Sequence, residues 1–502
     1  MGIIQKQSIR SSILIMVGFA IGGINILFIA PKMLTTQELG LTRIFLNLAV
    51  TLSTFCTLGS LPVIYKFSPI YRKHLTPEKS DLPFVTLMLC LLGFVILCIG
   101  GYLGQELIVR KYSARSPLFV KYSNWIFPFT FFMLLLLWLE AFSWTFKKTV
   151  ISNAMKELLP RLAFTVLLIL MGMHWLSLPV FIGMYAFSYL PAVIILFYTL
   201  RKTREFYFNG SLSKVTFRLK GKMATYGLFL FGAQFLNMLS KNSDDIIITA
   251  NAPRGLTDTA VFAIATYIIT LMEVPQRSIT AISMPVLAES WRNKDMDNIK
   301  HVYHKSVSNL MAIGLAMFAL LLLNSHNIMA YLGKDYSGIE FVILVLGLGK
   351  LADLCTGANA QIISTSSFWR AEFITNVIYT FLAIPLGYIL ITHYGLMGAA
   401  YAATISLCFF NLMRYFFLWY KYKLQPYTWK HLWVVLVTAG ITAVIHFYLP
   451  RHSSFIVDGI IRTASFSLVF FPFILTTRLS GEINQMANKQ WGNVKRLLGR
   501  NR

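Results

Sequence analysis

A charged cluster interrupts an apolar stretch of membrane-spanning length between Tyr226 and Ala252. Lys241, Asp244 and Asp245 all lie within it. A charge at the centre of a bilayer costs about 2.5–3.5 kcal/mol on insertion scales, so such residues normally face a bundle interior or a water-filled cavity. Lys241 shares a helix face with both acids, at i+3 and i+4, which allows local compensation. The stretch therefore predicts either an ion pair between helices or a lining for the passage of a solute.

The composition identifies a polytopic, all-α membrane protein. The chain has 502 residues, of which 56% are hydrophobic and 13% charged, and its mean hydropathy is +0.63. Its 45 Lys and Arg residues outnumber 20 Asp and Glu residues, but they gather in short loops, so no nucleic-acid surface is expected. The five cysteines lie in apolar spans without metal-ligand spacing, which predicts neither disulfides nor a metal site.

Scanning for apolar stretches of about 20 residues predicts fourteen spans. Their approximate limits are 8–30, 40–64, 82–104, 118–143, 158–174, 177–200, 224–251, 259–286, 303–325, 338–363, 371–392, 396–420, 431–449 and 456–477. Most Lys and Arg residues fall on the side that carries both termini, which predicts cytoplasmic termini. One predicted outer loop is an exception, because it contains Arg110, Lys111, Arg115 and Lys121.

The longest basic connection, 201–222, divides the predicted spans into two lobes. We expect an N-terminal bundle at 1–200, a C-terminal bundle at 223–420, a further helix pair at 421–477 and a basic cytoplasmic tail at 478–502. A weak internal similarity between 37–73 and 256–292 supports a duplicated plan, which is common in transporters with a site between two repeats.

Further ionisable residues lie inside the second lobe. Glu273 and Arg277 are spaced i, i+4 around Pro275, and Lys350 and Asp353 are spaced i, i+3. The candidate cavity residues are Lys241, Asp244, Asp245, Glu273, Arg277, Lys350, Asp353, Arg43 and Asn25. Glu140 and Arg414 lie near span ends, where snorkelling to the membrane surface explains them.

Adjacent residues on a helix point about 100° apart, so at most one of Asp244 and Asp245 is expected to face a cavity squarely. The sequence leaves open which of the two it is. It also contains no phosphate-binding GxxxxGK[ST] loop, no HExxH motif and no large extramembrane loop. These absences argue against an ATP-driven pump and against an enzyme.

Several segments resemble the polysaccharide-transporter branch of the multidrug/oligosaccharidyl-lipid/polysaccharide (MOP) exporter superfamily, which includes O-antigen flippases. The segments are APKMLTTQELGL (30–41), LNLAVTLSTFCTLGSLPVIYKF (46–67), SDDIIITANAPRGLTDTAVFAIATYI (243–268) and RAEFITNVIYTFLAIPLGYILITHYGLMGAAYAATIS (370–406). The resemblance implies two bundles around a central cavity, in a bacterial cytoplasmic membrane.

The substrate implied by the resemblance is a polyprenyl-pyrophosphate-linked oligosaccharide, with polysaccharide-assembly proteins as further partners. Cations such as Lys241, Arg277 and Lys350 suit a pyrophosphate. The neighbouring acids either neutralise these cations or bind H⁺ or Na⁺ for coupling. Two alternatives stay open: a cation-coupled multidrug exporter, although no acid lies between Ser11 and Ala30, and a membrane-embedded polysaccharide polymerase or ligase.

Overall fold

The structure is a computed structural model that describes residues 3–477, and these residues form helices and no strands. Contacts divide the chain into two compact units, with the boundary between Ile264 and Ala265. The predicted bundle limits are not tested by this division and stay predictions.

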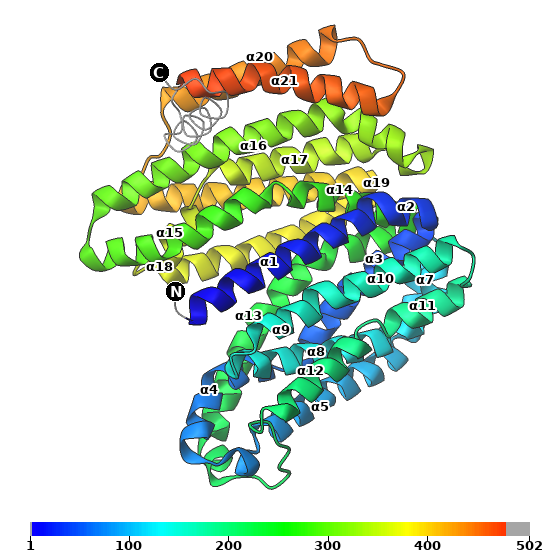
Figure 1. The fold of residues 1–502 in the computed structure, drawn as a ribbon, viewed down its shortest axis with the longest axis vertical. Helices are drawn as coiled ribbons and strands as arrows, with labels where there is room; N and C mark the ends of the chain where they lie inside the picture. The colour runs from blue at the N-terminus through cyan, green and yellow to red at the C-terminus, as the bar shows by residue number, and fades with distance from the viewer. Residues whose placement is uncertain (1–2, 478–502) are drawn as a thin grey trace, which may run out of the picture. The chain divides into compact units, whose positions relative to one another are not determined.

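The first unit contains α1 to α13 and most of α14 (Figure 1). The bounds are α1 (Ile3–Ile24), α2 (Ala30–Met33), α3 (Thr36–Cys56), α4 (Ser60–His74), α5 (Leu82–Leu103), α6 (Gln105–Tyr112), α7 (Pro117–Tyr122), α8 (Ile126–Thr145), α9 (Thr149–Asn153), α10 (Leu159–Gly172), α11 (Leu178–Ala186), α12 (Leu190–Lys202), α13 (Lys214–Asn251) and α14 (Leu256–Thr270). Helix α3 packs against α5, α8 and α13.

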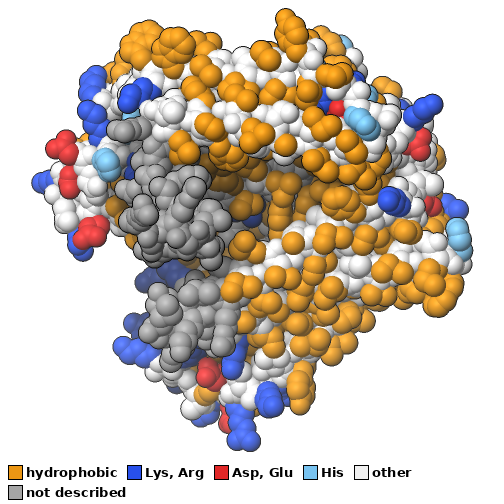
Figure 2. Space-filling view, turned by 45° about the horizontal axis from the view of Figure 1, so that its top comes forward, with side chains coloured by type: hydrophobic (Ala, Val, Ile, Leu, Met, Phe, Trp, Pro, Cys, Tyr) orange, Lys and Arg blue, Asp and Glu red, His pale blue; other side chains and the backbone are white. Residues whose placement is uncertain are grey.

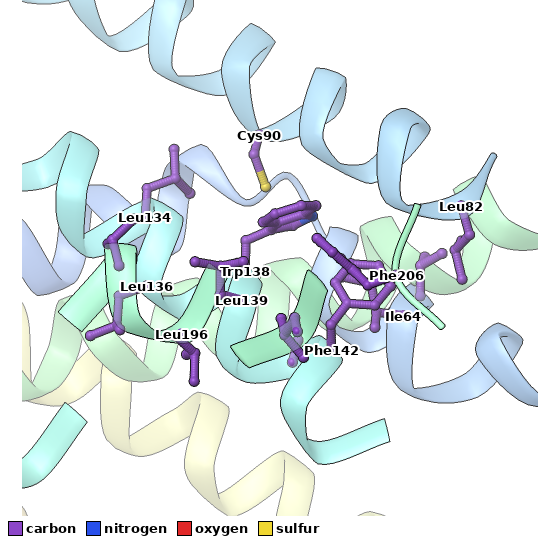
Figure 3. Close-up of a cluster of buried hydrophobic side chains, with 14 of the residues drawn as sticks. Ile64, Leu82, Cys90, Leu134, Leu136, Trp138, Leu139, Phe142, Leu196 and Phe206 are labelled. Atoms are coloured by element: carbon purple, nitrogen blue, oxygen red, sulfur yellow. The ribbon is translucent and has the colours of Figure 1, made fainter. Parts of the chain in front are cut away.

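A large hydrophobic core rich in aromatic residues lies where α4, α5, α8 and α12 of this unit pack together (Figure 3). Trp138 of α8 lies at its centre beside Cys90 and Phe206, and its indole nitrogen donates to Thr86 Oγ1 at 3.0 Å. The buried indole therefore has the polar partner that a Trp in an apolar core needs. Because Trp138 ties α8 to α5 and to the segment after α12, it fixes the scaffold on which α13 packs.

The second unit is built around the long helix α16. Its bounds are α15 (Glu273–Asn293), α16 (Met296–Leu332), α17 (Ile339–Cys355), α18 (Asn359–Thr365), α19 (Trp369–Tyr422), α20 (Trp429–Tyr448) and α21 (Phe455–Thr477). Helix α16 contacts α15, α17, α20 and α21, and α20 and α21 lie side by side (Figure 1). Helix α19 is broken at Gly395, whose φ of 57° and ψ of −132° suit only glycine.

Each of the fourteen predicted spans coincides with helical segments of the structure. Nine described helices are long and apolar enough to cross a membrane, or up to eleven when the bent pairs α14/α15 and α17/α18 each count as one span. The break at Gly395 separates the predicted spans 371–392 and 396–420. The spans predicted at 158–174 and 224–251 are helical, as α10 and within α13, but they are not among the nine helices that are long and apolar enough to cross a membrane. The number fourteen stays a prediction.

The exposed faces of these helices are apolar. Figure 2 shows hydrophobic side chains over much of the visible surface, with Lys, Arg, Asp and Glu gathered mainly at its edges. In α5, for example, Leu92, Val95 and Ile99 are each more than half exposed. A soluble protein rarely exposes so large a contiguous apolar surface. The surface therefore confirms a multi-pass membrane protein.

Candidate functional site

The second unit contains a buried ion network centred on Lys350. Its ammonium contacts Asp353 Oδ2 at 2.8 Å, Gln276 Oε1 at 3.0 Å and Glu273 Oε1 at 3.2 Å. Arg277 continues the chain by donating to Glu273 Oε2 at 3.1 Å. Both pairs that the sequence predicts, Glu273–Arg277 and Lys350–Asp353, are therefore present, and Lys350 joins one pair to the other.

Two amide side chains donate hydrogen bonds to the Asp353 carboxylate, and a threonine and a further asparagine support one of them. Asn411, on the second arm of α19, donates to Asp353 Oδ1 at 2.9 Å, and Gln276 donates to the other carboxylate oxygen at 3.1 Å. Asn411 in turn accepts from Thr356 Oγ1 at 2.9 Å and from Asn359 Nδ2 at 3.0 Å. Asp353 is only 9% exposed, so these bonds satisfy a carboxylate with almost no access to water.

Two broken helices place this network. A bend of 45° separates α14 from α15, and Glu273 is the first residue of α15. A bend of 48° separates α17 from α18 just after Asp353, where Gly357 has a φ of +63°. Discontinuous helices are tolerated at membrane depth where polar groups satisfy the freed backbone, and they often form ligand sites in transporters. An acid at the start of α15 is also favoured by the helix dipole.

The network is balanced in charge, because two cations match two acids. Its exposure is graded: the side chain of Arg277 is 60% exposed and that of Glu273 36%, whereas Lys350 is 8% exposed. Lys350 already has three acceptors, which uses all its N–H donors. Arg277 is therefore the member that has unused donors at an accessible surface.

A second polar cluster lies in the first unit, where α3 meets α13. Asn47 Nδ2 donates to Asp245 Oδ2 at 2.5 Å, and Asn242 Nδ2 donates to Thr51 Oγ1 at 2.9 Å. Asp245 Oδ1 is buried and has no hydrogen-bond partner among the described residues. Arg43, one helical turn before Asn47 on α3, is 9% exposed. Among the described residues the carboxylate is thus held by one amide, which is sparse solvation for a buried acid.

Polar side chains also form a stripe along the exposed side of α13, next to this cluster. Gln234, Asn237 and Lys241 are exposed, and Asp244 is half-buried; we call these four residues the polar stripe. The structure contains no ion pair between Lys241 and either acid within the part of the chain that it describes. The local compensation that the spacing allows for Lys241 is therefore not formed among the described residues, and Asp245 bonds to Asn47 of α3. Exposed amides and a cation on an otherwise apolar helix suit contact with water or a polar ligand.

Asn25 has a packing role in the structure. It lies at the start of a single π-helical turn, Asn25–Ile29, and is 1% exposed. Its side chain donates to the carbonyl of Arg161 at 2.9 Å and accepts from Thr165 Oγ1 at 2.8 Å. These bonds tie α1 to α10, and they leave little of the amide available to a ligand.

Other buried ion pairs escaped the sequence-based selection. Arg414 pairs with Glu372 across the two arms of α19 and is 7% exposed, while Glu140 is 4% exposed and accepts from Lys156 at 2.8 Å. The snorkelling predicted for Glu140 and Arg414 is wrong, because each has an internal partner. Gln276 and Asn411 were missed because uncharged amides inside apolar helices are common and their partners lie far away in sequence.

Comparisons with known proteins add the fold assignment. No family profile matches the sequence, and no curated protein matches it either. Among solved structures, the lipid II flippase MurJ in an inward closed conformation has 15% identity and a TM-score of 0.68, and covers 93% of this chain and 99% of its own. An inward-facing multidrug resistance MATE family transporter of the MOP superfamily has 16% identity and a TM-score of 0.57, and covers 83% of this chain and 98% of its own.

A MOP superfamily transporter from Pyrococcus furiosus, described as having a binding pocket of reversed polarity, has 15% identity and a TM-score of 0.53 over 84% of this chain and 96% of its own. The chain thus has the fold of a helical membrane transporter. More narrowly, its fold is that of solved MOP superfamily transporters, as the sequence resemblance implies. The polysaccharide-transporter branch stays a prediction.

Proposed function

We propose that this protein is a flippase that moves a polyprenyl-pyrophosphate-linked oligosaccharide across a bacterial cytoplasmic membrane by alternating access. The observation that carries the proposal is the likeness to the lipid II flippase MurJ, which extends over 93% of the chain at a TM-score of 0.68. The likeness to the MATE transporter extends over 83% at 0.57. The likeness to the flippase therefore covers more of this chain, at a higher TM-score, than the likeness to the multidrug transporter does.

The polar stripe on α13 supplies suitable chemistry for such a substrate. The exposed ammonium of Lys241 makes charge-assisted bonds to a pyrophosphate, and the amides of Gln234 and Asn237 donate to and accept from sugar hydroxyls. Arg277 is a second accessible cation with unused donors. Lys350 differs from these two, because its three acceptors hold it inside the buried ion network.

Energy coupling is assigned in this proposal to the acids of α13. Asp245 has one buried oxygen that lacks a hydrogen-bond partner among the described residues, and Asp244 follows at the edge of the polar stripe. Either H⁺ or Na⁺ would compensate such a carboxylate. Transport assays in a Na⁺-free buffer, with and without a proton gradient, separate the two ions.

Lys241→Gln tests the substrate contact. Loss of a charge-assisted hydrogen bond of about 1.5–3 kcal/mol predicts a roughly 10- to 100-fold drop in transport. Lys220→Gln is the matched control, because Lys220 is an exposed lysine on the same helix, about six turns away. In a host that lacks the native gene, the K241Q protein should reach the membrane but leave lipid-linked oligosaccharide on the cytoplasmic leaflet.

Surface polysaccharide is the second readout, and the mass of the accumulated lipid-linked oligosaccharide identifies the repeat unit. Lys241→Arg should keep most of the activity, because the charge and the donors remain. Normal polysaccharide in K241Q cells at normal protein abundance would remove Lys241 from the mechanism. If K241Q and K220Q fail alike, the defect is not specific to the polar stripe.

A multidrug exporter is the second candidate, favoured by the likeness to the MATE family transporter. It predicts that expression in a sensitive host confers resistance to cationic dyes. Polysaccharide export that depends on the protein, without dye resistance, would rule out this candidate.

A further inference from the structure

We propose that residues 104–122, which we call the basic shelf, bind anionic phospholipid headgroups at the membrane surface where α5 ends. The segment contains α6 and α7 and the four cations Arg110, Lys111, Arg115 and Lys121, with Glu106 as its one acidic residue. On the predicted topology this segment is an outer loop, where positive residues are usually depleted, so the cluster suits a ligand of opposite charge.

The height of the basic shelf in the membrane follows from α5. This helix belongs to an apolar span, Pro77–Leu103, whose last two residues, Tyr102 and Leu103, are 78% and 74% exposed. Helix α6 starts two residues later, after Gly104. A span that ends in exposed apolar and aromatic residues ends at the interface between hydrocarbon and headgroups. The cations that follow therefore lie at the level of lipid phosphates.

The faces of α6 suit an interfacial position. Ile108 and Tyr112 point to the protein side and are half-buried, whereas Leu107 is 70% exposed. On a helix, Arg110 and Lys111 follow Leu107 by three and four residues, so the exposed leucine lies between two exposed cations. A leucine that enters the acyl boundary between cations that reach phosphates is the pattern of an interfacial amphipathic helix.

The basic shelf is also a fixed platform. The rings of Tyr112 and Phe119 are 4.7 Å apart, and Ser116 Oγ donates to the carbonyl of Thr249 at 2.7 Å. A Cβ on Gly255 would lie 2.1 Å from the carbonyl oxygen of Arg115, so the shelf backbone is in direct contact with the α13–α14 turn. These contacts hold the cations in place before a ligand arrives, which reduces the entropy lost on binding.

A concave surface at the start of the shelf has space for a headgroup. It is an open depression of about 580 Å³ lined by Tyr102, Leu103, Gln105, Glu106, Val109 and Arg110. Apolar walls beside a guanidinium match the glycerol and phosphate regions of a phospholipid. Phosphatidylglycerol combines that phosphate with a net negative charge, and it is therefore the probe of choice.

The test places a fluorophore on the shelf. Ser113→Cys, an exposed position just after α6, is labelled with a membrane-impermeant maleimide dye, and the native thiols at Cys56, Cys90, Cys98, Cys355 and Cys408 are buried or half-buried. The protein is placed in nanodiscs, and quenching by spin-labelled phosphatidylglycerol is compared with quenching by spin-labelled phosphatidylcholine. We expect a clear preference for phosphatidylglycerol. Equal quenching by the two lipids would overturn the proposal.

Removing the cations provides the matched comparison. At roughly a fivefold loss of affinity for each surface cation removed, R110Q/K111Q in the S113C background should lower the preference by roughly 25-fold. The control R292Q/K294Q removes two exposed cations from the α15–α16 turn and should keep the preference. R110Q alone gives an intermediate loss if the double variant does not fold. An unchanged preference for phosphatidylglycerol without these cations would overturn the proposal. So would loss of that preference when inorganic phosphate alone is added to the wild-type residues.

Discussion

Replacing Lys350 by Met should expose how the buried ion network supports the second unit. Met fills most of the volume of the lysine stem but donates no hydrogen bonds. The change removes three contacts at once, at 2.8, 3.0 and 3.2 Å. Glu273 keeps Arg277 as its partner, and Asp353 keeps the amides of Asn411 and Gln276. Asp353 is then a buried carboxylate without a cation at hydrogen-bonding distance.

The size of the effect follows from that residual solvation. Removing one partner of a buried ion pair typically costs about 3–5 kcal/mol. Two amide donors to Asp353 place K350M near the lower limit, at about 3 kcal/mol. For a unit of roughly 150–250 residues, this corresponds to a melting temperature lower by about 6–12 °C. Glu273→Gln should cost less than about 1 kcal/mol, because that side chain is 36% exposed.

The double variant Lys350→Met with Asp353→Asn separates charge from packing. It removes the uncompensated acid, while the carboxamide that replaces the carboxylate still bonds to its amide neighbours, so most of the lost stability should return. Thermal unfolding of the purified protein in detergent, followed by size-exclusion chromatography, measures all three variants. If K350M melts no lower than E273Q, or if the double variant melts as low as K350M, the electrostatic reasoning is refuted.

Two further variants address the first unit. Asn47→Leu removes the one hydrogen-bond donor to the Asp245 carboxylate among the described residues, and should lower the free energy of unfolding by about 1–3 kcal/mol. The double variant N47L/D245N should recover stability, and equal melting temperatures of N47L and wild type would contradict this. Gly40→Ala would place a Cβ 1.9 Å from the carbonyl oxygen of Leu256 and should destabilise by at least about 1–3 kcal/mol; Gly100→Ala in α5, with no atom within 4 Å of its Cβ, is the control and should be neutral or slightly stabilising.

Local spacing in the sequence was enough to predict the helices and two of the charged pairs. Apolar length predicted the helical segments, and the i, i+3 and i, i+4 rules predicted Lys350–Asp353 and Glu273–Arg277. The link between the two pairs was not predictable, because it joins residues 77 positions apart in the chain, Glu273 and Lys350. It exists only once α15 and α17 pack together.

The same reasoning applies to the partner of Asp245 in α13. Helical spacing places Lys241 beside Asp244 and Asp245, so the sequence allows a local pair but cannot show a distant partner. In the structure, Asp245 turns to Asn47, which lies 198 residues earlier. A partner on α3 has no local signal, since an Asn within an apolar span is as consistent with helix packing as with a site.

The buried ion network connects three helices of the second unit. In the second unit, Lys350 connects the residue that begins α15 with the end of α17, and Asn411 connects that end with the second arm of α19. A movement of α15 relative to α17 must therefore break hydrogen bonds to the Lys350 ammonium inside the protein. The exposed Glu273–Arg277 pair is the weakest member, because water replaces its contacts at little cost. If the protein transports a substrate as proposed, a rearrangement of the bent helices should accordingly begin at Glu273, with Lys350 and Asp353 remaining paired.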